Sequence, residues 1–265
     1  MGPSGTVARI GDSLACLDGG PTLLYDQRFY DELWEGGRRA AQLVLPDVIA
    51  GVSPTTIVDV GCGGGSWLSV AADLGVADLT GVDSAQSRRA TSRFDAFNFI
   101  EADLARTLEL PRSYDLAMSI EVAEHLPPER AEGFVADLTR LAPVVLFSAA
   151  YPGQGGTGHI NEQWPSYWVE RFAAIGYRSL EVCRATHWND RESPMAIRTN
   201  MLLYVDSSIA SRFVNRWPSP VMVDVVHPSL WDSALLQHRR APHRLAGRVL
   251  REYGRAANLW TRRAR

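Results

Sequence analysis

Four side chains suited to acid–base or metal chemistry occur in two short stretches of the chain. Glu121, Glu124 and His125 form the pattern E-x-x-E-H within EVAEHLP, and His159 lies in the glycine-rich stretch QGGTGHINEQ. An imidazole can act as a general base near neutral pH without a large shift of its pKa. Two carboxylates and two imidazoles can also hold a divalent ion such as Mg²⁺ or Mn²⁺, which lowers the pKa of a bound hydroxyl. In a purely structural interpretation, Glu121 and Glu124 cap backbone groups of a turn.

A glycine turn upstream of these groups indicates a nucleotide-type binding site. It begins at the end of the apolar run TTIVDV and contains Asp59, Gly61, Gly63 and Gly65 at alternate positions. A dinucleotide-binding turn has glycine or alanine at the last place of its motif, where this chain has Ser66. An acid two residues before the first glycine suits a positively charged ligand better than a pyrophosphate.

Two further acids end the apolar runs that follow the turn. Asp83 lies 24 residues after Asp59, close to the spacing at which a carboxylate receives the two hydroxyls of a ribose. Asp103 ends the next run, near the expected place of an adenine amino group. The turn and the two acids at successive strand ends together predict an adenosine-type ligand.

Apolar runs of strand length alternate with helix-length segments from residue 55 onward, which is typical of βαβ units and predicts a doubly wound α/β domain. The expected strands are residues 55–60, 78–83, 97–103, 114–121, 143–150, 177–184 and 200–206. One helix is expected after Pro127 and Pro128, and another over WPSYWVERFAAIG with Gly176 at its end. We expect a helical lead-in at 1–45, a ligand-binding domain at 46–206 and a C-terminal extension at 207–265.

The segments VDVGCGGGSW, GVDSA, IEADL and YDLAMSIEVAEHLP resemble class I S-adenosylmethionine-dependent methyltransferases, and the similarity extends through FSAAYPGQGGTGHINEQWPSYW to about residue 206. That last stretch is similar to bacterial methyltransferases of glycan or secondary-metabolite (natural product) assembly. The resemblance implies a Rossmann-like, mostly parallel sheet of seven strands with an antiparallel last strand. It also implies contacts of S-adenosylmethionine with Asp59, Gly61, Gly63, Gly65, Asp83, Asp103, Leu104, Ser119, Glu121 and Tyr25.

The same E-x-x-E-H pattern with a distant histidine resembles the metal-binding set of small-RNA 2′-O-methyltransferases. The resemblance implies a metal at Glu121, Glu124, His125 and His159. The alternative from the residues themselves is that His125 or His159 serves as a metal-free base.

Charge is unevenly distributed along the chain. All 27 basic residues are arginine, and the last 28 positions hold nine of them against Glu252, a net charge of +8 that leaves −11 on residues 1–237. The acidic body disfavours nucleic acid as a partner. The tail predicts a basic amphipathic helix, which packs on the body or a second subunit, lies on an anionic membrane, or binds RNA.

These features lead to a methyl-transfer hypothesis with alternatives. The leading expectation is O-methylation of a hydroxyl on a sugar, glycan or small metabolite, and the alternatives are an RNA 2′-O-methyltransferase and a non-catalytic cofactor-binding module. No apolar run reaches the length of about 18 residues that a membrane-spanning helix needs, and the first twenty residues lack the layout of a signal peptide. We therefore expect a cytoplasmic protein, with peripheral membrane contact through the tail as an option.

Overall fold

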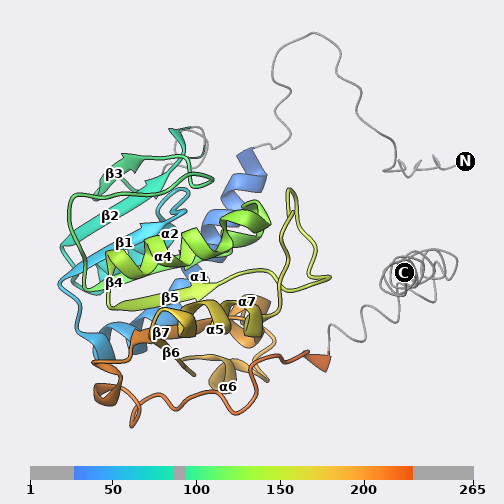
Figure 1. Cartoon of the computed structure of the whole chain (residues 1–265). Helices are drawn as coiled ribbons and strands as arrows, with labels where there is room; N and C mark the ends of the chain where they lie inside the picture. Colours follow the sequence, from blue (N-terminus) through green and yellow to red (C-terminus); the bar gives the residue numbers. More distant parts are fainter. Residues whose placement is uncertain (1–26, 86, 88–92, 229–265) are drawn as a thin grey trace, which may run out of the picture.

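The computed structural model describes residues 27–85, 87 and 93–228. Seven strands form one sheet in the order β3-β2-β1-β4-β5-β7-β6 (Figure 1). Their bounds are β1 Thr56–Val60, β2 Asp78–Asp83, β3 Asn98–Glu101, β4 Leu116–Ile120, β5 Val144–Ser148, β6 Tyr177–Leu180 and β7 Leu202–Asp206. Strands β1 to β5 pair in parallel, whereas β7 pairs antiparallel with both β5 and β6. The predicted fold, a mostly parallel seven-stranded sheet with an antiparallel last strand, is confirmed.

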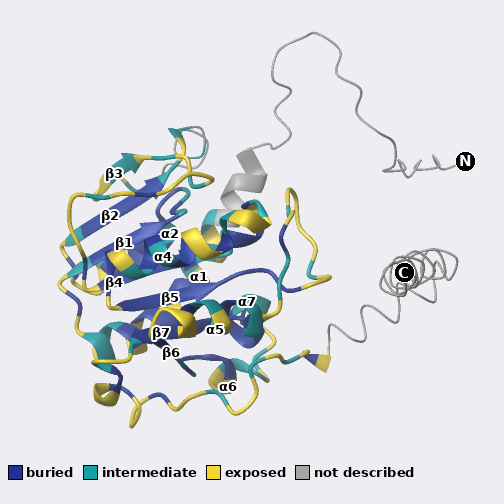
Figure 2. Ribbon diagram, viewed as in Figure 1, coloured by how far each residue is buried: buried dark blue, intermediate teal, exposed yellow. Residues whose placement is uncertain are grey.

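Helices cover both faces of this sheet (Figure 1). Helices α1 (Gln27–Val52) and α2 (Ser66–Asp73) pack on one face, and α4 (Ala131–Leu141) and α5 (Pro165–Ala174) pack on the other. Alternation along each strand supplies both layers, since Ile57 and Met118 join the first core cluster while Val58 and Ala117 join the second. Figure 2 accordingly shows the central strands buried over most of their length.

Each of the seven expected strands is present, with ends that differ by up to four residues. The largest difference is in the segment expected at 177–184, where β6 ends at Leu180 and α6 (Arg184–His187) begins four residues later. The pairing explains the early end, because Leu180 is the last β6 residue matched to β7. Helix α5 ends as expected near Gly176, which has a φ of 87°.

Segments on either side of the expected central domain pack into its core. Helix α1 runs from residue 27 to 52 without a break, so the expected boundary between 45 and 46 falls inside one helix. Its Val44 and Val48 lie in the same core cluster as Phe213 and Trp217, which follow β7. No helix in the described ranges is both long and apolar enough to cross a membrane. The predicted tail helix lies outside the described residues.

Candidate active site

The glycine turn connects β1 to α2 and holds the side chain of Asp83. Gly61, Gly63 and Gly65 have φ values of 88°, 52° and 83°, a region that side chains other than glycine rarely adopt. A Cβ at Gly61 would lie 2.3 Å from a methyl group of Val122, so this position also lacks room for a side chain. The N–H of Gly63 donates a hydrogen bond of 2.8 Å to Oδ2 of Asp83. This bond joins the glycine turn to the end of β2.

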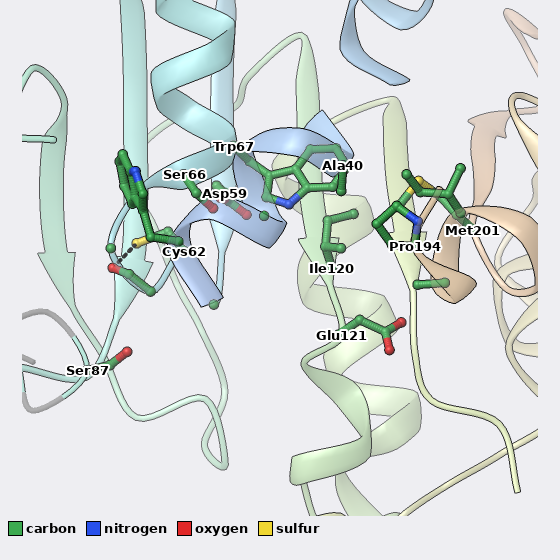
Figure 3. A pocket seen from close by; sticks show the side chains of 17 residues that line it. Ala40, Asp59, Cys62, Ser66, Trp67, Ser87, Ile120, Glu121, Pro194 and Met201 are labelled. Carbon is green, nitrogen blue, oxygen red and sulfur yellow. Dashed lines mark hydrogen bonds between the residues drawn. The ribbon is translucent and has the colours of Figure 1, made fainter. Parts of the chain in front are cut away.

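A cavity of about 420 Å³ opens beside this turn, a size typical of small-molecule sites. Asp59 lines it and is only 3% exposed. Burial and the nearby charge of Asp83 raise the pKa of Asp59 to about 8. Figure 3 shows Asp59 and Trp67 on one side of the cavity and Pro194 and Met201 on the other. A buried carboxyl facing a cavity favours a cationic ligand group, such as an ammonium.

A second hollow of about 690 Å³ lies at the ends of β2 and β3. Asp83, Asp103, Leu104 and His125 line it. Asp103 accepts a hydrogen bond of 3.0 Å from the N–H of Ala105, and its side chain is 62% exposed. The expected ribose and adenine residues thus share one hollow, which the bond between Gly63 and Asp83 links to the first cavity.

Glu121 directly follows β4 in a left-handed backbone conformation, with a φ of 55°. Such a conformation costs a residue other than glycine about 1–3 kcal/mol and is found mostly at functional sites. Its carboxylate accepts hydrogen bonds from Nε2 of Gln154 at 2.6 Å and from Nδ2 of Asn200 at 3.1 Å. Burial raises the pKa of Glu121, although these amide donors oppose the shift. Glu121 lines the first cavity, as expected for a cofactor contact.

Ser119 is fully buried within β4, and it lines neither cavity. Successive side chains of a strand alternate between the faces, so Ile120 reaches the first cavity whereas Ser119 points to the other face. The Ser119 side chain therefore lines neither cavity, and the expected contact of the Ser119 to Glu121 strand end with the cofactor stays a prediction.

Glu124, His125 and His159 come together in one cluster. The first two lie on a 3₁₀ turn, η1 (Ala123–His125), and His159 comes from the loop between β5 and α5. Candidate ligand atoms of the three side chains all lie within 4.8 Å of one another. The rings of His125 and His159 meet edge to face, with centroids 4.9 Å apart. The structure therefore brings together His125 and His159, which are 34 positions apart in the sequence.

The carboxylate of Glu124 is fully buried, and neither of its oxygens has a hydrogen-bond partner. Burial and the neighbouring charge of Glu121 raise the pKa of Glu124. The nearest imidazole nitrogen recorded is Nε2 of His159, 4.0 Å from Oε1. Burial and the nearby His159 lower the pKa of His125, which favours its neutral form. The capping interpretation of Glu124 stays a prediction, since the backbone N–H groups of Glu124 and Ala150 act on its carboxylate and oppose the rise of its pKa.

The loop between β5 and α5 is held against η1. The backbone N–H groups of Ile160 and Asn161 both donate to the carbonyl oxygen of Glu124, at 2.9 and 3.0 Å. Within the loop, the carboxylate of Glu162 accepts hydrogen bonds from Gly153, Gly155 and the ring of His159. The sequence analysis did not single out Glu162, although an acid three residues after a candidate histidine was a readable signal.

Two residues that hold Glu121 come from different segments. Gln154 begins the glycine-rich stretch QGGTGHINEQ, whereas Asn200 belongs to no motif of the sequence analysis. The first cavity is closed on one side by Pro194 and Met201, which flank helix α7 (Met195–Thr199). Tyr25, an expected cofactor contact, lies outside the described residues.

Comparison with known proteins agrees with this geometry. Residues 57–143 match the family model described as a methyltransferase domain. A search of curated proteins finds no match. The seven-stranded sheet is that of the Rossmann-like methyltransferase fold, and residues 57–143 within it match a methyltransferase domain.

Solved structures share the fold at low sequence identity. The sugar N-methyltransferase KedS8 from a Streptoalloteichus species is 16% identical, with a TM-score of 0.53, covering 76% of this chain and 99% of that one. The methyltransferase domain of bacterial CtHen1 is 22% identical, with a TM-score of 0.47, covering 63% and 97%. Magnesium protoporphyrin IX methyltransferase from Synechocystis PCC 6803 is 17% identical, with a TM-score of 0.48, covering 72% and 90%.

Proposed function

We propose that this protein transfers the methyl group of S-adenosylmethionine to a hydroxyl of a small polar acceptor, such as a sugar, a glycan or a secondary metabolite. The observation that carries the proposal is the cluster of Glu124, His125 and His159 beside the cofactor cavities, with a buried carboxylate that has no hydrogen-bond partner. A hydroxyl keeps its proton at neutral pH, so its methylation needs a base at this place.

The two cavities suit the two ends of the cofactor. Asp59 and the glycine turn would receive the amino-acid end, because Asp59 offers a carboxylate to its ammonium group. Asp83 would receive the ribose hydroxyls and Leu104 would lie beside the adenine. A carboxylate oxygen can accept more than one hydrogen bond, so Asp83 can hold Gly63 and the ribose together.

Methyl transfer from a sulfonium is an in-line displacement. The acceptor oxygen forms a bond to the methyl carbon while the carbon–sulfur bond breaks, and the electron pair of that bond returns to sulfur. The proton of the hydroxyl passes to an imidazole nitrogen of the cluster. His125 fits this role, because its lowered pKa keeps the ring neutral near pH 7 and it lines the hollow that contains Asp83.

The same cluster fits a divalent ion such as Mg²⁺ or Mn²⁺. Glu124, His125 and His159 would hold it, and the unpartnered oxygens of Glu124 are the observation that supports this fit. Such an ion would supply Lewis acidity that lowers the pKa of a hydroxyl. Glu121 is not in this group, because its carboxylate is already held by Gln154 and Asn200.

A methyl-transfer assay with radiolabelled cofactor tests the proposal. Sugars, glycans, amines of the same skeletons and short RNA would be offered as acceptors, with His125→Ala and His159→Ala as variants. We expect transfer to a hydroxyl and a loss of about 10²-fold or more in rate in at least one variant. Transfer only to an amine or to RNA would refute the acceptor class. Cofactor binding without any turnover on cell-extract fractions would favour a binding module.

Removal of divalent metal distinguishes a metal-dependent mechanism from one in which a histidine is a metal-free base. If a divalent ion is required, exhaustive chelation should abolish transfer, and added Mg²⁺ or Mn²⁺ should restore it. Full activity after chelation would leave the histidine as a metal-free base. Full activity of both histidine variants would reject both versions.

A further inference from the structure

Glu162 is the centre of a hydrogen-bond network that spans the loop between β5 and α5. Its Oε2 accepts the N–H of Gly153 at 2.8 Å, and its Oε1 accepts the N–H of Gly155 at 2.8 Å. Oε1 also lies 3.0 Å from Nδ1 of His159. Burial alone would raise the pKa of Glu162, but these three donors lower it overall. A single ionised side chain thus ties both the start of the loop and the imidazole near its end.

The contact with Glu162 determines which nitrogen of His159 carries the proton. A carboxylate only accepts hydrogen bonds, so Nδ1 facing it must be the protonated nitrogen of a neutral ring. The remaining nitrogen, Nε2, then carries a lone pair. Nε2 faces Glu124, at 4.0 Å from its Oε1. The lone pair that could accept a proton or hold a cation is therefore directed toward the cluster.

The loop backbone restricts the ring from another side. A Cβ placed on Gly156 would lie 2.2 Å from Nε2 of His159, far closer than any real contact. Gly158 lies close to the other ring, because its carbonyl oxygen is 3.3 Å from Nδ1 of His125. The glycines of this loop therefore allow the backbone to wrap around the two rings, and Glu162 holds that wrapped form.

We propose that Glu162 is a positioning residue of this site, which fixes His159 with its proton on Nδ1 and its Nε2 toward Glu124 and keeps the loop closed over the cluster. The proposal rests on the proposed function for its catalytic meaning. Its geometric content, the tautomer and the closed loop, can be measured without any acceptor.

The substitution Glu162→Gln tests the tautomer with little change in size. A glutamine has only one oxygen, which can accept the N–H of Gly153 in place of Oε2, while its amide nitrogen in place of Oε1 presents an N–H to the ring and no acceptor to Gly155. An N–H facing Nδ1 requires a lone pair there, so the proton should move to Nε2. Glu192→Gln is the matched control, because Glu192 pairs with Arg39 on the surface, away from the loop.

The measurement is the ¹⁵N spectrum of histidine-labelled, metal-free protein at about pH 8.5, well above the ordinary histidine pKa of about 6.5. The His159 signals are assigned by their absence in His159→Gln. We expect the Nδ1–H form in the wild type and in Glu192→Gln, and the Nε2–H form in Glu162→Gln. An Nε2–H form in the wild type would overturn the proposal, and so would a wholly Nδ1–H form in Glu162→Ala, which has no side-chain acceptor for that proton.

Amide hydrogen exchange provides a second readout that does not depend on the tautomer. Glu162→Ala should accelerate exchange at Gly153 and Gly155 by at least tenfold, whereas Glu192→Ala should leave both unchanged. Exchange as slow as in the wild type would contradict the loop-closing role. Gly156→Ala, which leaves Glu162 in place, should shift the His159 signals by displacing its ring.

Activity then distinguishes this proposal from the proposed function. With an active acceptor, Glu162→Gln should lower kcat by tenfold or more while calorimetry shows unchanged binding of S-adenosylmethionine. If no acceptor is methylated but the tautomer changes as expected, the positioning role stands and the proposed function fails. If transfer proceeds at the wild-type rate in Glu162→Gln, the positioning role fails.

Discussion

The acids of this site differ in what stabilises their charge. Asp83 accepts backbone N–H groups, and Glu121 accepts two side-chain amides. Glu124 has no hydrogen-bond partner for either oxygen, and Asp59 faces a cavity. An unpaired buried carboxylate is costly unless a proton or a cation neutralises it. A bound cation would therefore be stabilised most strongly next to Glu124 and Asp59.

Replacement of Asp83 tests the cofactor assignment. Asp83→Ala should weaken binding of S-adenosylmethionine by about 1.5–3 kcal/mol, because charge-assisted hydrogen bonds to the ribose are lost. Calorimetry measures the affinity. Asp73→Ala is the control, since Asp73 is an exposed acid at the far end of α2. Equal affinities of Asp83→Ala and the wild type would reject the assignment.

Asp59 gives a pH dependence of stability with a definite sign. Its pKa of about 8 in the folded protein exceeds the ordinary value of 3.8, so the folded state holds this proton more tightly than the unfolded chain. In the cofactor-free protein, the contribution of protonated Asp59 to the free energy of unfolding is therefore fully present at low pH. It falls as pH rises from about 4 to about 8. Asn at this position does not titrate.

Asp59→Asn should consequently gain stability relative to the wild type as pH rises, by up to a few kcal/mol near pH 8. Urea unfolding of both proteins at about pH 5.5 and pH 8, without cofactor, measures the difference. A difference that is the same at both pH values would show that Asp59 titrates normally. The same variant should bind S-adenosylmethionine more weakly, because the partner of the ammonium group is gone.

Among the elements, the turn between β1 and α2 needs glycine for two different reasons, a positive φ and a lack of room for a side chain. Gly61 has both a positive φ and no room for a Cβ, whereas Gly63 has a positive φ and nothing within 4 Å of a Cβ. The open space next to Gly63 belongs to the cavity in which the cofactor is expected. Gly61 is therefore needed for folding, whereas Gly63 is needed to leave room for the ligand.

Alanine substitutions at these two glycines should give different results. Gly61→Ala should cost roughly 2–5 kcal/mol of folding stability, from backbone strain and contact with Val122. Gly63→Ala should cost only about 1 kcal/mol, yet weaken cofactor binding at least tenfold because the methyl group occupies ligand space. Thermal unfolding and calorimetry measure the two effects. Similar losses of stability in both variants would contradict this separation.

At the scale of the whole molecule, segments distant in sequence complete one core. Trp217, 3% exposed, stacks near Phe213 and donates its indole N–H to Oδ2 of Asp47 on α1 at 2.6 Å. Further along, the guanidinium of Arg184 donates to the carbonyl oxygens of Met222 and Val223. The chain after β7 is thereby fastened to both α1 and α6 as far as the described residues extend.

Removal of this anchor should destabilise the entire protein. Trp217→Ala should cost about 3–5 kcal/mol, the usual cost of deleting a buried aromatic side chain, and should lower the melting temperature accordingly. Trp164→Ala is a suitable control, because Trp164 is 37% exposed. If Trp217→Ala melts like the control, the segment after β7 does not contribute to the core as proposed.

The arginine-rich tail gives a prediction independent of that anchor. Truncation after Gln237 removes the nine C-terminal arginines and should leave the affinity for S-adenosylmethionine unchanged. A lower melting temperature would indicate packing of the tail on the body. Loss of salt-sensitive sedimentation with anionic vesicles would indicate a membrane role. Loss of cofactor affinity at an unchanged melting temperature would mean that the tail reaches the active site.

Local patterns in the sequence determined the strands, the glycine turn and the acids at the strand ends. These features follow from short-range rules, since apolar runs form strands and parallel strands bring their carboxyl ends to one edge. The segment E-x-x-E-H was likewise readable because Glu124 and His125 are neighbours in the chain. The predicted fold therefore required no knowledge of tertiary contacts, and neither did the choice of residues proposed to hold the cofactor.

The tertiary structure decided which of these residues act together. Glu121 and Glu124 share one motif, but the strained turn after β4 separates them: Asn200 and Gln154 hold Glu121, while Glu124 joins the two histidines. The pairing of His159 with Glu162 depends on how a glycine loop folds back on η1. Such loop contacts depend on packing between distant segments, and sequence periodicity carries no information about them.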